Sequence, residues 1–339
     1  MSDILKQLTK KKKELDKYIP LKKELQDSLN KWLDVELTYS SNAIEGNTLT
    51  RIETAEVIER GVSAVISGKP LKDQLEAVNH AKAICFIKSI VKQKKTHQNI
   101  TEVDIRAIHK LILTGIDDEW VGRYRQIDIF IRGSNVEFPS PSSVPYKMKE
   151  FIEWLEGQRG KHPVRVASDA HFQFVSIHPF IDGNGRTARL LMNLILIFNN
   201  YPITVIRNED RIQYLNALEV AQKTGNLKAF YKLIELAVDR SLDIYINAAK
   251  GKSSKLLDGK ERKKEKLLKI GELAQATRET NATIRYWMKE GLLEVAGYTK
   301  GGYQLYKHDM INRVKDIRRL QKERLSLIEI KNRLIERLT

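Results

Sequence analysis

The stretch His178-Pro179-Phe180-Ile181-Asp182-Gly183-Asn184-Gly185-Arg186-Thr187-Ala188-Arg189 carries more recognisable chemistry than any other part of the 339-residue chain. Gly183, Asn184 and Gly185 allow backbone angles that bulkier residues avoid, and they precede an apolar run with helical periodicity over 187–199. A glycine-rich loop at the start of a helix presents free N–H groups and a partial positive charge. The stretch therefore predicts an anion site that suits phosphate.

The polar residues of the same stretch extend this prediction. Arg186 and Arg189 are three positions apart, so both can reach one ligand from the first helical turn. Asp182 offers a carboxylate beside the phosphate, where Mg²⁺ binds readily. His178 offers a base with an ordinary pKa near neutrality. Each residue alone has a common structural interpretation, but their conjunction indicates phosphoryl or nucleotidyl transfer.

Outward from this stretch the sequence is mainly helical. Leucines recur at three- and four-residue spacings through the N-terminal third, and Gly46 is typical of a helix end. Thr50–Glu53 and Thr101–Asp104 fit capping boxes. Further helices are predicted over 71–91, 101–113, 146–158, 164–176, 186–199, 211–224 and 308–338. The β-branched run 127–131, returning over 136–138, predicts one short hairpin.

The twelve quoted residues match every fixed position of H-P-F-x-[D/E]-G-N-[G/K]-R-x-x-R, the motif of the Fic (Fic/DOC) family. The chain resembles that family over about residues 38–235. The resemblance implies a mainly α fold, a helical core with a short β-hairpin flap. It also implies transfer of AMP from ATP to a Ser, Thr or Tyr hydroxyl of a protein target, the chain itself included.

The resemblance also implies roles for the residues of the motif. His178 would deprotonate the target hydroxyl, and Asp182 would hold Mg²⁺ on the phosphates. The remaining motif residues would bind ATP, with an anion hole of Gly183, Asn184 and Gly185 and a grip on the outer phosphates by Arg186 and Arg189.

Residues outside the motif also receive roles from the resemblance. Tyr214 and Gln222 would line the base pocket, although Tyr214 is equally typical of a core aromatic residue. The flap that aligns a target segment by strand addition would consist of Ile131, Arg132, Gly133 and Ser134. The complete motif favours AMP transfer. Members that transfer phosphocholine or act as kinases depart from it or bind nucleotide inverted, and the sequence alone does not exclude these activities.

The segment Ser41-Asn42-Ala43-Ile44-Glu45-Gly46 resembles the family's inhibitory signature, [S/T]-x-x-x-E-[G/N]. A carboxylate in the last turn of a helix is unfavourable with the helix dipole unless a cation pairs with it. The resemblance implies that Glu45 pairs with Arg189, with Ser41 in the same signature. The alternative is that Glu45 is a surface residue before a glycine cap. Because some relatives run both directions, removal of AMP is a further expectation.

The net charge of +16 is concentrated near the C-terminus, where residues 249–339 hold 23 Lys+Arg against 12 Asp+Glu. The segment 249–268 is typical of a linker. Over about residues 269–330 the chain resembles the winged helix-turn-helix of the MerR family, which implies DNA contacts from Thr283, Arg285 and Tyr286. Gln304 replaces an arginine of the family's wing, which removes one expected phosphate contact. The alternative is that this module docks a protein or only packs.

The whole chain is expected to comprise four parts: an N-terminal helical region over 1–100, a catalytic core over 101–248, the linker 249–268 and the winged helix over 269–339. One cysteine, the lack of an apolar leader and a longest apolar run of 190–198 favour a cytoplasmic protein without a membrane partner. A homodimer is a further expectation. The alternative for the whole protein is a DNA-binding regulator whose Fic part senses nucleotide.

Overall fold

The structure, a computed structural model, divides the chain into two compact units, Met1–Ser253 and Ser254–Thr339. It describes residues 3–63, 66–131, 136–252, 267–293, 295, 297–298, 304–306, 309–323, 325–327, 329–330 and 333. The finer division of the first unit at residue 100 stays a prediction.

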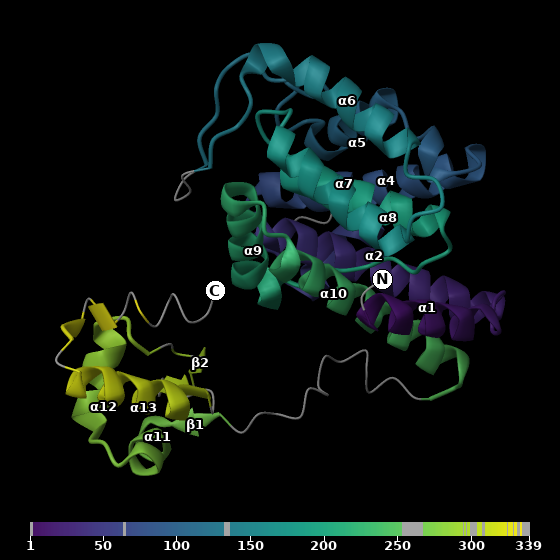
Figure 1. The fold of residues 1–339 in the computed structure, drawn as a ribbon. Coiled ribbons are helices and arrows are strands. Elements are labelled where there is room, and N and C mark those ends of the chain that lie inside the picture. Colours follow the sequence, from purple (N-terminus) through teal and green to yellow (C-terminus); the bar gives the residue numbers. More distant parts are fainter. Residues whose placement is uncertain are drawn as a thin grey trace. The chain divides into compact units, whose positions relative to one another are not determined.

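The first unit is a bundle of helices around α8, which is buried along almost its whole length. Its helices are α1 (Asp3–Asp16), α2 (Lys23–Ile44), α3 (Arg51–Arg60), α4 (Leu71–Gln93), α5 (Glu102–Leu113), α6 (Val144–Glu156), α7 (Pro163–Ile177), α8 (Asn184–Phe198), α9 (Arg211–Thr224) and α10 (Lys228–Ala249). The hairpin of α7 and α8 packs on α4 and α5, while α1 packs along α10 (Figure 1).

The predicted helix starts and the predicted helix end at Gly46 are found in the structure. Thr50 and Glu53 form a capping box at the start of α3, and Thr101 and Asp104 form one at α5. Gly46 adopts a φ of +99° after α2, a conformation that favours glycine. The N-terminal helical stretch is two helices rather than one, because Pro20 lies in the break between α1 and α2.

The predicted hairpin before Pro139 is not present in the residues described there, because 127–131 and 136–138 contain no strand. The physical reason lies in Arg125, whose guanidinium donates to the carbonyls of Ile127 and Pro139 and so replaces a strand ladder. Ile127 and Phe130 are exposed rather than packed on a sheet partner. Arg132, Gly133 and Ser134 lie outside the described residues.

The second unit contains α11 (Ile270–Thr277), α12 (Asn281–Lys289), α13 (Asp309–Lys322) and a small antiparallel sheet of strands β1 (Leu268–Lys269), β2 (Gly297–Tyr298) and β3 (Gln304–Tyr306) in the order β1-β3-β2. Ile284, Trp287 and Tyr306 belong to its own apolar core. The continuous helix predicted over 308–338 is wrong. Glu323 lies in a turn, and the Ser326 side chain caps a new helical segment by accepting from the Glu329 N–H.

Candidate active site

The loop between α7 and α8 holds the quoted motif in a conformation set by its own side chains. His178 ends α7 with a φ of +49°, and Gly183 begins α8 with a φ of +76°. Between them, the Asn184 amide accepts from the Phe180 N–H at 3.0 Å and donates to the Phe180 carbonyl at 2.8 Å. These two hydrogen bonds close the loop over the start of α8 and leave that helix end available to a ligand.

The geometry around His178 determines which nitrogen carries its proton. Nδ1 lies 3.2 Å from the Val175 carbonyl, which can only accept, so Nδ1 is the protonated nitrogen. Nε2 therefore keeps its lone pair, and no residue in the described part of the chain hydrogen-bonds it. Burial lowers the pKa of His178 to about 4, with Arg125 as a smaller cause. The imidazole is thus neutral at pH 7, as a general base requires.

A second histidine, His109 of α5, packs against the loop and forms a hydrogen bond with it. Its Nε2–H donates to the Asp182 carbonyl at 2.9 Å, and its Nδ1 accepts from the Gly122 N–H at 2.9 Å. The ring stacks on Phe180 with centroids 3.6 Å apart. A Cβ on Gly183 would lie 3.3 Å from the His109 ring. The loop is therefore in contact with α5, and glycine is required at 183 by both space and φ.

Arg186 is almost fully buried between two carboxylates. Its Nη1 donates to Glu76 of α4 at 3.0 Å, and its Nη2 lies 3.4 Å from both carboxylate oxygens of Asp182. The Asp182 side chain is itself about half exposed at 55%. One exposed carboxylate beside an anion site fits Mg²⁺, which usually takes one or two carboxylates together with substrate phosphates. Within the described residues there is no larger cluster of acidic, histidine or cysteine ligands.

Arg189 is buried and faces the end of α2. Its guanidinium donates to the Ser41 hydroxyl and carbonyl, each at 2.9 Å, and to Oε1 of Glu45 at 2.6 Å. The hydroxyl of Tyr214 lies 3.4 Å from Nη1 of Arg189 and 2.9 Å from Nε2 of His171. The structure thus brings Arg189 together with Ser41 and Glu45, which precede it by 144 or more positions in the sequence.

Glu45 also contacts the backbone at the start of α8. Its Oε1 lies 2.5 Å from the position that a Cβ on Gly185 would occupy. The carboxylate therefore lies against the first turn of α8, where the helix dipole favours negative charge. The charge that is unfavourable at the end of α2 is compensated by Arg189 and by the N-terminus of α8. Glu45 keeps partial solvent contact, with its side chain 38% exposed.

The remaining predicted site residues lie in less informative surroundings. Tyr214 is buried, so both of its interpretations stay open. Gln222 donates to the Val175 carbonyl at 3.4 Å, the same carbonyl that contacts His178. Ile131 is 42% exposed, and its three flap neighbours lie outside the described residues.

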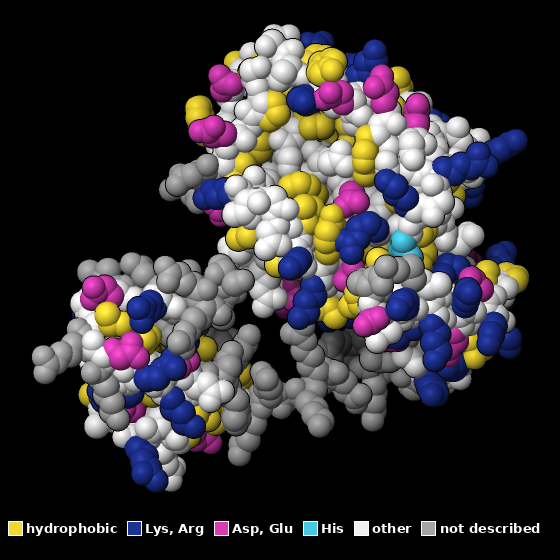
Figure 2. All heavy atoms as spheres, in the orientation of Figure 1, with side chains coloured by type: hydrophobic (Ala, Val, Ile, Leu, Met, Phe, Trp, Pro, Cys, Tyr) yellow, Lys and Arg dark blue, Asp and Glu magenta, His cyan; other side chains and the backbone are white. Residues whose placement is uncertain are grey.

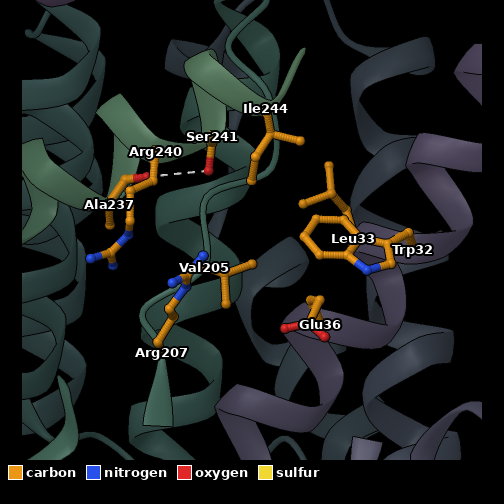
Figure 3. Close-up of a pocket in the computed structure, with 9 residues that line it drawn as sticks. All are labelled: Trp32, Leu33, Glu36, Val205, Arg207, Ala237, Arg240, Ser241 and Ile244. Carbon is orange, nitrogen blue, oxygen red and sulfur yellow. Dashed lines mark hydrogen bonds between the residues drawn. The ribbon is translucent and has the colours of Figure 1, made fainter. Parts of the chain in front are cut away.

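Two hollows of the first unit lie away from the motif. A cavity of about 20 Å³, room for one water, lies between α2 and α10 (Figure 3). The Ser241 hydroxyl beside it donates to the Ala237 carbonyl at 3.2 Å. A wider cleft of about 610 Å³ borders the turn after α2 and is lined by Tyr39, Ala43, Asn47, Thr48, Leu49, Thr50, Arg51, Ile52 and Asn208.

In the second unit, α12 carries the three residues that are predicted to contact DNA. Arg285 and Tyr286 are exposed, while Ile284 and Trp287 on the same helix are buried. The N-cap residue Thr280 accepts from the Thr283 N–H at 3.0 Å. Figure 2 shows Lys and Arg side chains spread over the visible face of the first unit and interleaved there with Asp and Glu.

Sequence reasoning missed the residues that hold the motif in place, Glu76, Asn47, His109 and Arg125. No sequence signal singled out Glu76, because the helix predicted over 71–91 carries several other polar residues on the same face. None singled out Arg125 either, because its partners are all backbone carbonyls.

Comparisons with known proteins give a consistent result for each unit. The model of the Fic/DOC family matches residues 99–196, and the model of the MerR HTH family regulatory proteins matches residues 268–336. The curated "Protein adenylyltransferase Fic" of Nematostella vectensis is 33% identical over 230 residues, 67% of this chain and 51% of that protein. That of Drosophila grimshawi is 35% identical over 61% of this chain and 42% of that protein. The chain thus spans about half the length of these relatives.

Two solved structures resemble the fold over most of the first unit. Fic-1 from C. elegans (aa134–508) aligns with a TM-score of 0.66 and 30% identity, over 74% of this chain and 73% of that one. A Fic domain containing signaling protein from Bacteroides thetaiotaomicron aligns with a TM-score of 0.65 and 33% identity, over 75% of this chain and 100% of that one.

Proposed function

The chain belongs to the Fic/DOC family, and on that premise we propose that it is a protein adenylyltransferase, which transfers AMP from ATP to the hydroxyl of a protein side chain. One observation carries the proposal. The start of α8 already contacts an anionic group, since Glu45 lies against Gly185 and pairs with Arg189. A helix end and an arginine that together hold a carboxylate are suited to a phosphate.

In the proposed reaction His178 accepts a proton at Nε2 from the target hydroxyl. The hydroxyl oxygen then forms a bond to the α-phosphorus of ATP, the bond from that phosphorus to the bridging oxygen breaks, and pyrophosphate leaves. The neutral tautomer of His178 supports this role, because Nε2 carries the free lone pair. Below a pH of about 4 His178 becomes charged and can no longer accept the proton.

The residues of the loop position ATP. The N–H groups at the start of α8 form the anion hole, with Gly183, Asn184 and Gly185, and Arg186 and Arg189 grip the outer phosphates. Asp182 would hold Mg²⁺, which would neutralise charge on the phosphates. Tyr214 and Gln222 line the base pocket, and the segment at 131–134 aligns the target.

In this proposal Glu45 is an inhibitor within the same chain. While Arg189 donates to Glu45 and Ser41, it is not available to the γ-phosphate, and the carboxylate itself lies in the space that phosphate would take. ATP therefore binds in a pose that blocks in-line attack. The reverse reaction, release of AMP from a modified target, would use the same groups.

The experiment compares labelling of the purified chain by ATP carrying ³²P at the α-phosphate, with Mg²⁺ present. Glu45→Gly should raise labelling at least tenfold, because an ion pair of about 1.4 kcal/mol or more is lost. Glu45→Gly combined with His178→Ala should abolish it. Mass spectrometry of the labelled protein should show a gain of one AMP. Equal labelling in Glu45→Gly and the parent would contradict the inhibitory role, and labelling that survives His178→Ala would remove His178 from the base role.

A second candidate is a DNA-binding regulator whose Fic part senses nucleotide. The match of 268–336 to a MerR-type model and the exposure of Arg285 and Tyr286 on α12 favour it. On this candidate Arg285→Ala should abolish retention on DNA, and the Glu45→Gly chain should bind ATP without becoming labelled. We place both functions in the cytoplasm. None of the described helices combines the length and the apolarity that a membrane crossing demands.

A further inference from the structure

Glu76 of α4 is a buried carboxylate whose two oxygens serve two different parts of the site. Oε1 accepts from Nη1 of Arg186 at 3.0 Å, and Oε2 accepts from Nδ2 of Asn47 at 2.8 Å. Glu76 is only 7% exposed and Arg186 only 2%. A buried charge is tolerated only with its partners in place, so the positions of Arg186 and Asn47 are set by one carboxylate.

Asn47 belongs to the turn that carries Glu45. Its Nδ2 also donates to the Asp73 carbonyl at 2.9 Å, and its Oδ1 accepts from the Leu49 N–H at 3.0 Å. The turn after α2 is therefore attached to α4 through Asn47, separately from the contact of Glu45 with Arg189. It is also attached through Thr48, whose N–H and hydroxyl donate to the Asp73 carboxylate at 2.7 and 2.6 Å. Both arginines of the motif are in this way connected to the same short segment.

We propose that Glu76 is a positioning residue that couples Arg186 to the inhibitory turn. This inference rests on the proposed function. Glu45 restrains Arg189 directly, while Glu76 aims Arg186 and at the same time holds the turn through Asn47. A phosphate that shifts the Arg186 guanidinium on Glu76 weakens the support of the turn, and a displaced turn leaves Glu76 to Arg186 alone. Such coupling is reciprocal, because each event changes the equilibrium of the other by the same factor.

Glu76→Gln tests the coupling with a side chain of nearly the same shape. Arg186 and Asn47 donate to different oxygens of Glu76, and the amide places a donating nitrogen at one of these two positions, so one of the two donors loses its acceptor. We expect the labelling rate at saturating ATP to rise about fivefold, because the turn is released. We expect ATP affinity, measured by calorimetry in the His178→Ala background, to fall by a similar factor, because Arg186 is no longer aimed. A merely structural residue would lower the rate.

Asn47→Ala separates the two effects of Glu76, because it removes the hydrogen bond between Glu76 and the turn and leaves the pair of Glu76 and Arg186 intact. The labelling rate should rise, while ATP affinity should be no weaker than in the parent. The matched control is Glu235→Gln, which changes a buried carboxylate of α10 that pairs with Arg165 at 3.1 Å. Its rate and ATP affinity should equal those of the parent.

The Glu45→Gly background makes the outcomes distinguishable. There, Asn47→Ala should add nothing to the rate, because the inhibition is already gone, while Glu76→Gln should still weaken ATP binding. The coupling is overturned if Glu45→Gly raises labelling and neither Asn47→Ala nor Glu76→Gln does so alone. If Glu45→Gly does not label at all, the proposed function fails. Calorimetry then tests Glu76 by itself, and unchanged ATP affinity in Glu76→Gln would overturn its positioning role.

Discussion

At the scale of single residues, Gly183 shows how conformation and space combine. Its φ of +76° costs a residue with a side chain about 1 kcal/mol or more, and its Cα faces the ring of His109. Gly225 after α9 provides a comparison, because it has a φ of +72° and no atom lies within 4 Å of the position that a Cβ would take there. Both glycines have a positive φ, but only at Gly183 would an added Cβ also meet a close neighbour.

Gly183→Ala should therefore lower the free energy of unfolding by more than Gly225→Ala, which should cost only about 1 kcal/mol. Gly183→Ala should also abolish labelling in the Glu45→Gly background, because the loop must shift away from His109, whereas Gly225→Ala should keep it. Denaturant unfolding and the labelling assay measure both effects. Equal losses of stability in the two variants would contradict the close packing of Gly183 on His109.

At the scale of elements, α5 supports the start of α8 through one side chain. His109→Phe keeps the stack on Phe180 but removes the donor to the Asp182 carbonyl and the acceptor for the Gly122 N–H. Each buried group left unpaired costs about 1–3 kcal/mol, so the two together should lower the free energy of unfolding by about 2–6 kcal/mol. Labelling in the Glu45→Gly background should fall with it.

The control for that variant is His97→Phe. His97 is also buried, but it has one hydrogen bond, to Asn199 at 3.1 Å, and no contact with the loop. It should lose less stability and keep full labelling. A His109→Phe protein that unfolds like its parent and labels at the parent's rate would show that the loop does not depend on α5.

At the scale of the whole molecule, buried histidines link stability to pH. Burial lowers the pKa of His80 and of His171 to about 3. Above pH 6.5 both are neutral in the folded and unfolded states. As the pH falls below 6.5, the unfolded chain binds protons that the folded chain does not, so the free energy of unfolding falls by about 1.4 kcal/mol per pH unit for each histidine.

Denaturant unfolding of the parent between pH 7.5 and 5 should show this decline. His80→Gln should make it shallower by about one proton, because one of the buried histidines no longer titrates. A parent whose stability is constant between pH 6.5 and 5, or a variant with the same slope as the parent, would contradict the burial of neutral histidines.

Across these scales, local patterns predicted the elements better than the contacts between them. The capping boxes at Thr50 and Thr101 and the helix end at Gly46 were readable because each depends on residues three or four apart. The strands predicted over 127–131 and 136–138 are absent from the residues described there, because the nearby Arg125 side chain satisfies backbone carbonyls that the strand pattern assigns to a ladder. Hydrogen bonds from a side chain to loop carbonyls leave no periodic pattern in the sequence.

The sequence by itself determined that this protein has a glycine-rich anion loop at the start of an apolar helix, with a histidine, a carboxylate and two arginines around it, because those residues lie within twelve positions. The resemblance implied the pair of Glu45 and Arg189, and only the tertiary structure decided that Arg186 contacts Glu76. Glu45 meets Arg189, and Glu76 meets Arg186, across separations of 144 and 110 residues. Which charges pair over such distances depends on how the helices pack, and packing is a property of the whole core.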